Sequence, residues 1–233
     1  MIFFQWQALR IFAVTAAAAI LTELAAKRLL KSQPRLYDGS VLITALLLTL
    51  MMPPNIPSWQ AALGSAFAVS FGKEIFGGLG QNPFNPVLVG RAFLGLCFPS
   101  TSSFPVPLAE SLTAGILIGA AILLSTRSIR WEIPLLYLGS VLIFSWAMGR
   151  GGEQVFLSGS IFLAAFFIVT DPVTTPTTRL GERWFAFGSG FLTVLIRERT
   201  SFADGATYGI LVMNALSPRL DDWLRPSRAR KAL

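Results

Sequence analysis

The chain has 233 residues, of which 53% are hydrophobic and 13% are charged. A soluble domain carries about 25% charged residues, so this composition excludes an ordinary soluble core and predicts an integral membrane protein. The net charge is +7, but the basic residues lie between apolar runs and at the C-terminus, which suits a bilayer better than a nucleic-acid groove. With no histidine and one cysteine, Cys97, no haem, no iron–sulfur cluster on this chain alone and no metal site are expected.

The predicted fold class is all-α, with about nine transmembrane or half-spanning helices in a single membrane domain, residues 1–233. Several apolar segments are shorter than the roughly 20 residues that cross a bilayer as a helix. Short segments need ends that are buried in protein or line a wet cavity, because lipid cannot pair free backbone groups. In chain order the segments are 4–26, 39–52, 58–75, 86–98, 109–124, 134–148, 156–170, 184–196 and 205–216.

The positions of the basic residues predict the orientation in the membrane. They fill the gaps after the first, fifth and seventh segments and a basic tail, 219–233, whereas the loops 53–57 and 99–108 carry no charge. Because basic loops stay on the cytoplasmic side, we expect a multi-pass protein of the inner (plasma) membrane with its N-terminus outside and its C-terminus cytoplasmic.

Several charged residues lie inside or at the ends of apolar segments, Arg197 among them, and four are selected here as site candidates. Charges at membrane depth are costly and are usually paired or functional, so these four are candidates for structural or ion-path roles. Snorkelling to the interface is the alternative for Lys73, and Arg91 is expected to pair with a glutamate or to bind an anionic ligand. The four residues are Glu23, Lys73, Glu74 and Arg91.

The first polar motif, residues 77–86, reads GGLGQNPFNP. Its glycines allow the backbone to approach a ligand closely, Asn85 suits a helix N-cap, and Pro86 suits the first helical turn. A helix N-terminus attracts anions; the alternative is a re-entrant turn with a good cap. The candidate ligand-binding residues are Gly80, Gln81, Asn82, Pro83, Phe84 and Asn85.

The second motif, residues 170–178, reads TDPVTTPTT and follows a short apolar segment. Its hydroxyls and carboxylate suit a flavin ring edge, a phosphate or a cation, and the alternative is a proline-stiffened polar loop. The candidates are Thr170, Asp171, Thr174 and Thr175. In the predicted topology both motifs face the inner side, which predicts that they contribute to one pocket.

The two halves of the chain, about 38–108 and 156–222, resemble each other. Residues 64–74 read GSAFAVSFGKE and residues 188–198 read GSGFLTVLIRE. Further pairs are Gly39–Ser40 with Gly159–Ser160, Asn85 with Asp204, and Gly90 with Gly209. In the predicted topology the matched segments run in opposite directions, which indicates inverted repeats, a device that builds a site near the bilayer midplane.

Three stretches carry a family resemblance: GGLGQNPFNPVLVGRAFL, FFIVTDPVTTPTT and LIRERTSFADGATYGILVMNALSPRLD. In this order they resemble the D subunit of the Rnf electron-transport complex and the B subunit of the sodium-pumping NADH:quinone oxidoreductase. The resemblance implies two inverted repeats similar to urea transporters. It also implies partner membrane subunits and electron transfer through flavins, coupled in known members to Na⁺ or H⁺ movement.

One departure from the family concerns its flavin. Family members carry FMN covalently on a threonine, in a motif such as S-G-A-T within an insert between the fourth and fifth segments. Here the loop 99–105 reads PSTSSFP, so the chain resembles a short form and covalent FMN is not expected. Residues 204–207, DGAT, look similar but coincide with a helix start in the family. Non-covalent riboflavin or FMN at the two inner motifs is the remaining expectation.

Two other functions stay open. A solute or ion channel on the same scaffold would conduct a small neutral solute into liposomes. A structural subunit that has lost its cofactor sites would keep electron transfer after joint substitution of Asn82, Asn85, Asp171 and Thr174.

Overall fold

The computed structural model describes residues 2–30, 38–53, 55–99, 110–149, 159–199 and 204–225, and every regular element within these ranges is a helix. The all-helical fold expected from the composition is thereby confirmed for the described residues. The chain divides into two compact units, an N-terminal unit, Met1–Phe104, and a C-terminal unit, Pro105–Leu233.

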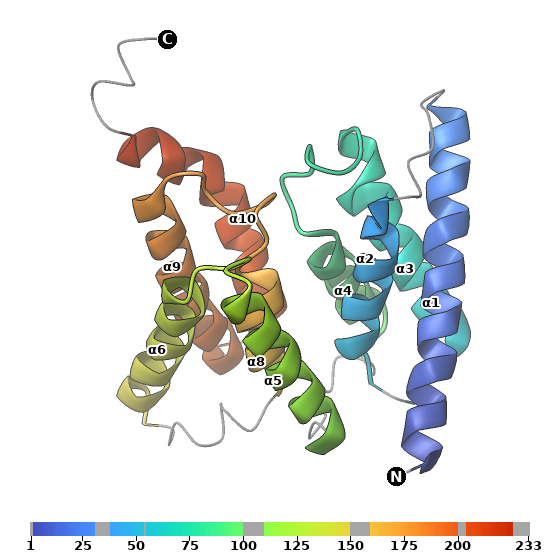
Figure 1. Cartoon of the computed structure of the whole chain (residues 1–233), viewed down its shortest axis with the longest axis horizontal. Helices are drawn as coiled ribbons and strands as arrows, with labels where there is room; N and C mark the ends of the chain where they lie inside the picture. The colour runs from blue at the N-terminus through green and yellow to red at the C-terminus, as the bar shows by residue number, and fades with distance from the viewer. Residues whose placement is uncertain are drawn as a thin grey trace. The chain divides into compact units, whose positions relative to one another are not determined.

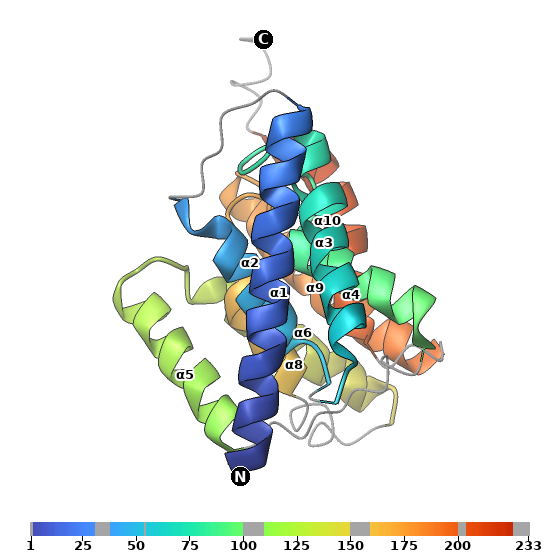
Figure 2. The same cartoon turned by 90° about the vertical axis from the view of Figure 1, so that its right-hand side faces the viewer.

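In the N-terminal unit a long first helix packs against α2 and α3, and α3 packs in turn against α4 (Figures 1 and 2). Its elements are α1 (Ile2–Leu29), α2 (Ser40–Leu50), α3 (Ser58–Gly72), the 3₁₀ turn η2 (Glu74–Phe76) and α4 (Pro86–Cys97). Small residues allow close helix packing: a Cβ on Gly90 would lie 2.7 Å from the carbonyl oxygen of Gly64. The core cluster comprises Ala19, Val41, Ala45 and Val69.

In the C-terminal unit α9 packs against both α6 and α10 (Figure 1). The elements are α5 (Glu110–Ser125), α6 (Glu132–Ala147), α8 (Gly159–Leu163) with its π-helical continuation η4 (Ala164–Ile168), α9 (Arg179–Arg199) and α10 (Gly205–Leu224). Again a glycine sits at the tight contact, since a Cβ on Gly209 would lie 2.8 Å from the backbone nitrogen of Thr193.

Each of the nine predicted apolar segments contains a helix, but several ends differ. α9 begins at Arg179 instead of residue 184, because its first turn is polar and an apolar pattern does not mark it. α10 continues through Pro218 to Leu224, so the first residues of the predicted tail are helical. α3 ends at Gly72, which leaves Lys73 outside the helix.

Several described helices are apolar, and exposed tryptophans lie near helix ends. Trp6–Leu29 is long and apolar enough to cross a bilayer, and shorter apolar helices accompany it, among them Ser40–Leu50 and Pro86–Cys97. All six tryptophans are 56–78% exposed, and each lies within two turns of a helix end, which is typical of residues at a membrane interface. They are Trp6, Trp59, Trp131, Trp146, Trp184 and Trp223.

The two units contain corresponding features at the positions that the sequence pairs. Asn85 and Asp204 each cap the following helix through a side-chain oxygen, which accepts from the backbone N–H of Val87 and Thr207 respectively. The inverted relation of the halves, the urea-transporter-like arrangement and the orientation of the termini stay predictions.

Candidate functional site

The glycine-rich loop of the N-terminal unit, residues 77–85, is a tight turn between η2 and α4. Gly77, Gly78 and Gly80 have φ values of 107°, 101° and 87°, which residues with a side chain rarely adopt. The backbone N–H groups of Gly77 and Gly78 donate to the carbonyl oxygens of Glu74 and Lys73, at 3.0 and 3.1 Å. Apart from its chain neighbours, no heavy atom of the described residues lies within 4 Å of the position where Gly80 would carry a Cβ, so this part of the loop faces open space.

The two asparagines of this loop have different roles. Asn85 is the N-cap of α4, and its Oδ1 accepts from the backbone N–H of Val87 at 3.0 Å. Asn82 is only 4% exposed, and its Nδ2 donates to the carbonyl oxygen of Phe84 at 3.0 Å. The Oδ1 atom of Asn82 is buried and has no hydrogen-bond partner in the described structure. An unpaired buried acceptor costs about 1–3 kcal/mol, which makes this oxygen a candidate ligand contact.

The remaining candidates of the first motif lie toward the loop surface. Gln81 is exposed, and its side-chain oxygen lies against Gly77. Pro83 is exposed, while Phe84 is half-buried with its ring centroid 6.4 Å from that of Phe76. The fold therefore gathers Gly80 to Asn85 into one turn whose buried members are Asn82 and Asn85.

A buried charge cluster joins α1 to the end of α3 beside this loop. Lys73 Nζ lies 3.1 Å from Glu23 Oε1 and donates to Ser40 Oγ at 2.8 Å. Lys27 Nζ lies 3.3 Å from Glu74 Oε2. The side chains of Lys73 and Glu23 are only 2% and 1% exposed, so snorkelling of Lys73 is wrong: the chain leaves α3 at this residue and turns the ammonium group inward.

The cluster also contacts the glycine loop directly. A Cβ on Gly78 would lie 3.1 Å from Lys27 Nζ, so the lysine occupies space that only glycine leaves free. Lys27 belongs to the basic gap that follows the first predicted segment, and the structure shows that it is buried and paired with Glu74. Arg91 of α4 is likewise buried and has interaction partners within the protein.

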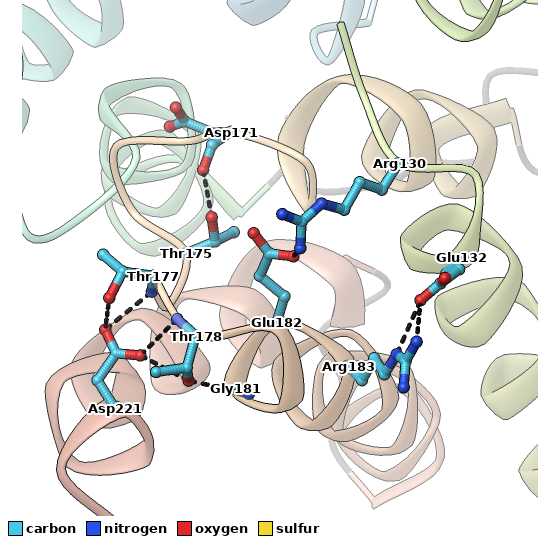
Figure 3. A network of polar contacts seen from close by, with 10 residues as sticks. All are labelled: Arg130, Glu132, Asp171, Thr175, Thr177, Thr178, Gly181, Glu182, Arg183 and Asp221. Atoms are coloured by element: carbon cyan, nitrogen blue, oxygen red, sulfur yellow. Dashed lines mark hydrogen bonds and ion pairs between the residues drawn. The ribbon is translucent and has the colours of Figure 1, made fainter. Parts of the chain in front are cut away.

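In the C-terminal unit the second motif folds around Asp171. Its Oδ1 accepts from the backbone N–H of Val173 and its Oδ2 from the hydroxyl of Thr174, both at 3.1 Å. The Thr175 hydroxyl donates to the Asp171 carbonyl oxygen at 2.8 Å (Figure 3). The Thr170 hydroxyl donates to the carbonyl oxygen of Phe166 at 2.7 Å. The structure therefore brings Asp171, Thr174 and Thr175 together, with their hydroxyl protons used inside the loop and oxygen lone pairs left as acceptors.

Two residues of α10 that were not among the sequence candidates hold this loop. Asn214 Nδ2 donates to the carbonyl oxygen of Thr174 at 3.2 Å. The Asp221 carboxylate accepts from the backbone N–H and the hydroxyl of both Thr177 and Thr178, at 2.8–2.9 Å (Figure 3). Their spacing of seven residues, nearly two helical turns, places them on one face and is the signal that sequence reasoning missed.

The Asp221 carboxylate lies beyond the apolar part of α10, and its ionisation follows from these contacts. Burial alone would raise the pKa of Asp221, but the hydrogen bonds from Thr177 and Thr178 outweigh burial and lower the pKa below its usual value. The carboxylate is therefore charged at neutral pH.

Partly exposed ion pairs connect the helix starts next to the second motif. Arg130 pairs with Glu182, and Arg183 Nε donates to Glu132 Oε2 at 2.7 Å (Figure 3). The Thr178 hydroxyl accepts from the backbone N–H of Gly181 at 3.2 Å and so caps α9. The loop thus lies between a fixed start of α9 and one face of α10.

Comparison with known proteins gives consistent matches along the chain. The model of the family described as NQR2, RnfD, RnfE matches residues 1–108 and 101–230. The chain is 31% identical to the D subunit of the proton-translocating ferredoxin:NAD(+) oxidoreductase complex of Clostridium ljungdahlii, over 94% of this chain and 83% of that protein. It is similarly 31% identical to the D subunit of the Na(+)-translocating ferredoxin:NAD(+) oxidoreductase complex of Acetobacterium woodii, over 92% and 80% of the two chains. The D subunit of the ion-translocating oxidoreductase complex of Stutzerimonas stutzeri is 32% identical, over 96% and 85%.

Proposed function

Because the chain belongs to the NQR2, RnfD, RnfE family, we propose that it is the membrane-embedded D subunit of an ion-translocating electron-transport complex. The family match confirms the resemblance that the sequence motifs indicated. The relatives named above are subunits of multi-subunit complexes, which supports other membrane subunits as the partners of this chain.

The cofactor that we propose for this subunit is a non-covalent flavin, riboflavin or FMN. A bound flavin supplies one- and two-electron transfer. The glycine-rich loop fits such a group, because it combines open space at Gly80 with a buried acceptor, Asn82 Oδ1, that has no partner among the described residues. The Asn82 oxygen is the observation on which the proposal depends, since the N–H and hydroxyl groups of a flavin are matching donors.

The loop at Asp171 offers a second set of acceptors. The hydroxyl oxygens of Thr174 and Thr175 donate their protons within the loop and keep lone pairs that can accept from flavin hydroxyl or imide groups. We propose that Thr170, Asp171, Thr174 and Thr175 bind a non-covalent flavin through such oxygens.

Covalent FMN is not part of the proposal. The family model matches in two stretches that meet at residues 101–108, where the sequence lacks the insert with the attachment motif. The alignment with the Clostridium ljungdahlii protein spans 274 positions, more than the 233 residues of this chain, which supports an insert in that relative. Thr207, in the similar DGAT sequence, is buried in the first turn of α10.

The charged residues Glu23, Lys73, Glu74 and Arg91 are proposed as structural support for the glycine-rich loop. Glu23 is paired with Lys73, and Glu74 with Lys27. Carboxylates that are already paired with lysines suit a structural role better than the binding of a transported ion.

Flavin analysis of the purified native complex tests this function. We expect denaturation to release flavin into solution, and we expect this chain to show no flavin fluorescence on a denaturing gel. In an Asn82→Leu variant the affinity for riboflavin and FMN should fall by about tenfold, the effect of losing one or two hydrogen bonds. Leu79→Ala, an exposed position of the same loop, is the control and should leave the affinity unchanged.

The proposal would be contradicted by a native complex without flavin, or by equal flavin affinity in the Asn82→Leu and Leu79→Ala variants. A fluorescent band at the mass of this chain would instead indicate covalent attachment.

A further inference from the structure

The second motif loop, residues 170–178, is only partly folded by its own hydrogen bonds. Asp171 organises the first part through its contacts with Val173, Thr174 and Thr175. The last part, Thr177 and Thr178, directs both of its backbone N–H groups and both of its hydroxyls to Asp221 of α10. The shape of the loop therefore depends on a residue 43 positions further along the chain.

The contact with Asp221 fixes more than one degree of freedom. Asp221 Oδ2 takes both donors of Thr177 and Oδ1 takes both donors of Thr178, all at 2.8–2.9 Å. The N–H bonds orient the main chain, and the hydroxyl bonds select the side-chain rotamers. Asp221 is only 8% exposed, so few water molecules can replace these contacts.

An anion suits this position for two further reasons. The carboxylate lies beside Thr178, which caps α9 through Gly181, and the start of a helix favours negative charge. A carboxamide would turn an NH₂ group toward two of the four donors, since an amide has only one acceptor oxygen. Asn214 adds a contact from the same face of α10, to the carbonyl oxygen of the proposed site residue Thr174.

We propose that Asp221, together with Asn214, is a positioning residue of the cofactor site, holding the Thr170–Thr178 loop in the shape that presents its oxygens to the flavin. This role rests on the proposed function. It assigns a task to two polar residues of α10 that touch the loop but are not themselves expected to touch the cofactor.

The test compares four forms of the purified whole complex: wild type, Asp221→Asn, Asp222→Asn and Tyr137→Phe. Asp222→Asn removes the neighbouring charge, and Asp222 is exposed. Tyr137→Phe removes the contact of a buried hydroxyl with Thr193, at 3.1 Å in the same unit. It therefore controls for a general loss of stability of this unit, because it leaves the loop contacts intact. Each form is measured for hydrogen exchange of residues 170–181 and, after flavin depletion, for rebinding of riboflavin and FMN.

We expect Asp221→Asn to raise the rate of backbone amide hydrogen exchange in residues 170–181 by about tenfold, because charge-assisted hydrogen bonds are lost. We also expect the affinity for flavin to fall by about tenfold. Both controls should bind flavin as the wild type does. Adding Thr177→Val to Asp221→Asn should weaken flavin rebinding little further, because Asp221→Asn already disturbs the contact between Thr177 and residue 221.

Unchanged exchange in Asp221→Asn would overturn the positioning of the loop, whether or not flavin binds. Faster exchange with wild-type flavin affinity would overturn the link to the cofactor, as would an equal loss of affinity in Tyr137→Phe. A wild-type complex that binds no flavin would overturn the proposed function itself, a result distinct from the other outcomes.

Discussion

The two motif loops are held by different electrostatic means. In the N-terminal unit, two buried pairs of full charges, Lys73 with Glu23 and Lys27 with Glu74, fix the glycine-rich loop to α1. In the C-terminal unit, one carboxylate accepts four hydrogen bonds from uncharged groups. Buried ion pairs add little net stability but are costly to break. We therefore expect the first loop to be sensitive to removal of a charge and the second to the number and direction of its hydrogen bonds.

The largest effect should follow from Lys73→Met, which leaves Glu23 buried without its cation. Removing one member of a buried pair costs about 3–5 kcal/mol of unfolding free energy. Thermal unfolding of the purified protein in detergent measures this loss. The double variant Glu23→Leu with Lys73→Met removes both charges and should recover most of it. A double variant no more stable than Lys73→Met would show that the loss of stability does not come from an unpaired Glu23.

The next effect concerns pH and Asp221. Hydrogen bonds lower the pKa of Asp221 in the folded state. The contribution of the ionised Asp221 to the free energy of unfolding is therefore complete above the unfolded pKa of about 3.9, and it disappears as the pH falls through the folded-state pKa. The wild type should therefore be more stable than Asp221→Asn at neutral pH by about 2 kcal/mol. This difference should shrink only below about pH 4, and a difference that already vanishes at pH 6 would contradict the assignment.

A smaller effect separates two glycines of the first loop. Gly78→Ala and Gly80→Ala both place a side chain at positive φ, a strain of about 1–3 kcal/mol. Only the methyl group on Gly78 would also meet Lys27 Nζ, at 3.1 Å. We expect Gly78→Ala to be the less stable variant in the same unfolding measurement. Equal losses would mean that the lysine moves aside freely.

The smallest effect is expected at the surface pair Arg183–Glu132, whose side chains are about half and one-third exposed. Arg183→Gln should lower the unfolding free energy by about 0–1 kcal/mol, because solvent screens exposed pairs. Raising the salt concentration should remove the difference from the wild type. A loss as large as that of Lys73→Met would contradict the contrast between buried and exposed pairs.

The sequence allowed the helices to be predicted better than the contacts between them. Apolar runs located every segment, and the NP sequence at Asn85 predicted the cap and start of α4. The polar first turn of α9 was missed, because it is fixed by the Thr178 hydroxyl and by ion pairs. Lys27 and Asp221 were missed as loop anchors, because each contacts a partner far away in the chain, and local sequence patterns do not indicate such contacts.

Of the site itself, the sequence predicted which residues lie together in each loop but not how they differ. Asn82 and Asn85 look equivalent in GGLGQNPFNP, yet one oxygen caps a helix and the other has no partner in the described structure. Both residues are buried, and the turn that follows the glycines directs the Asn85 oxygen, but not the Asn82 oxygen, to a backbone N–H.

A direct test of the central claim is an experimental density map of the purified native complex, at a resolution that resolves ring systems. The account predicts flat, tricyclic flavin density with a donor atom about 3 Å from Asn82 Oδ1 and no covalent link to this chain. Flavin density confined to other subunits, with the Asn82 oxygen paired to protein or lipid, would contradict it.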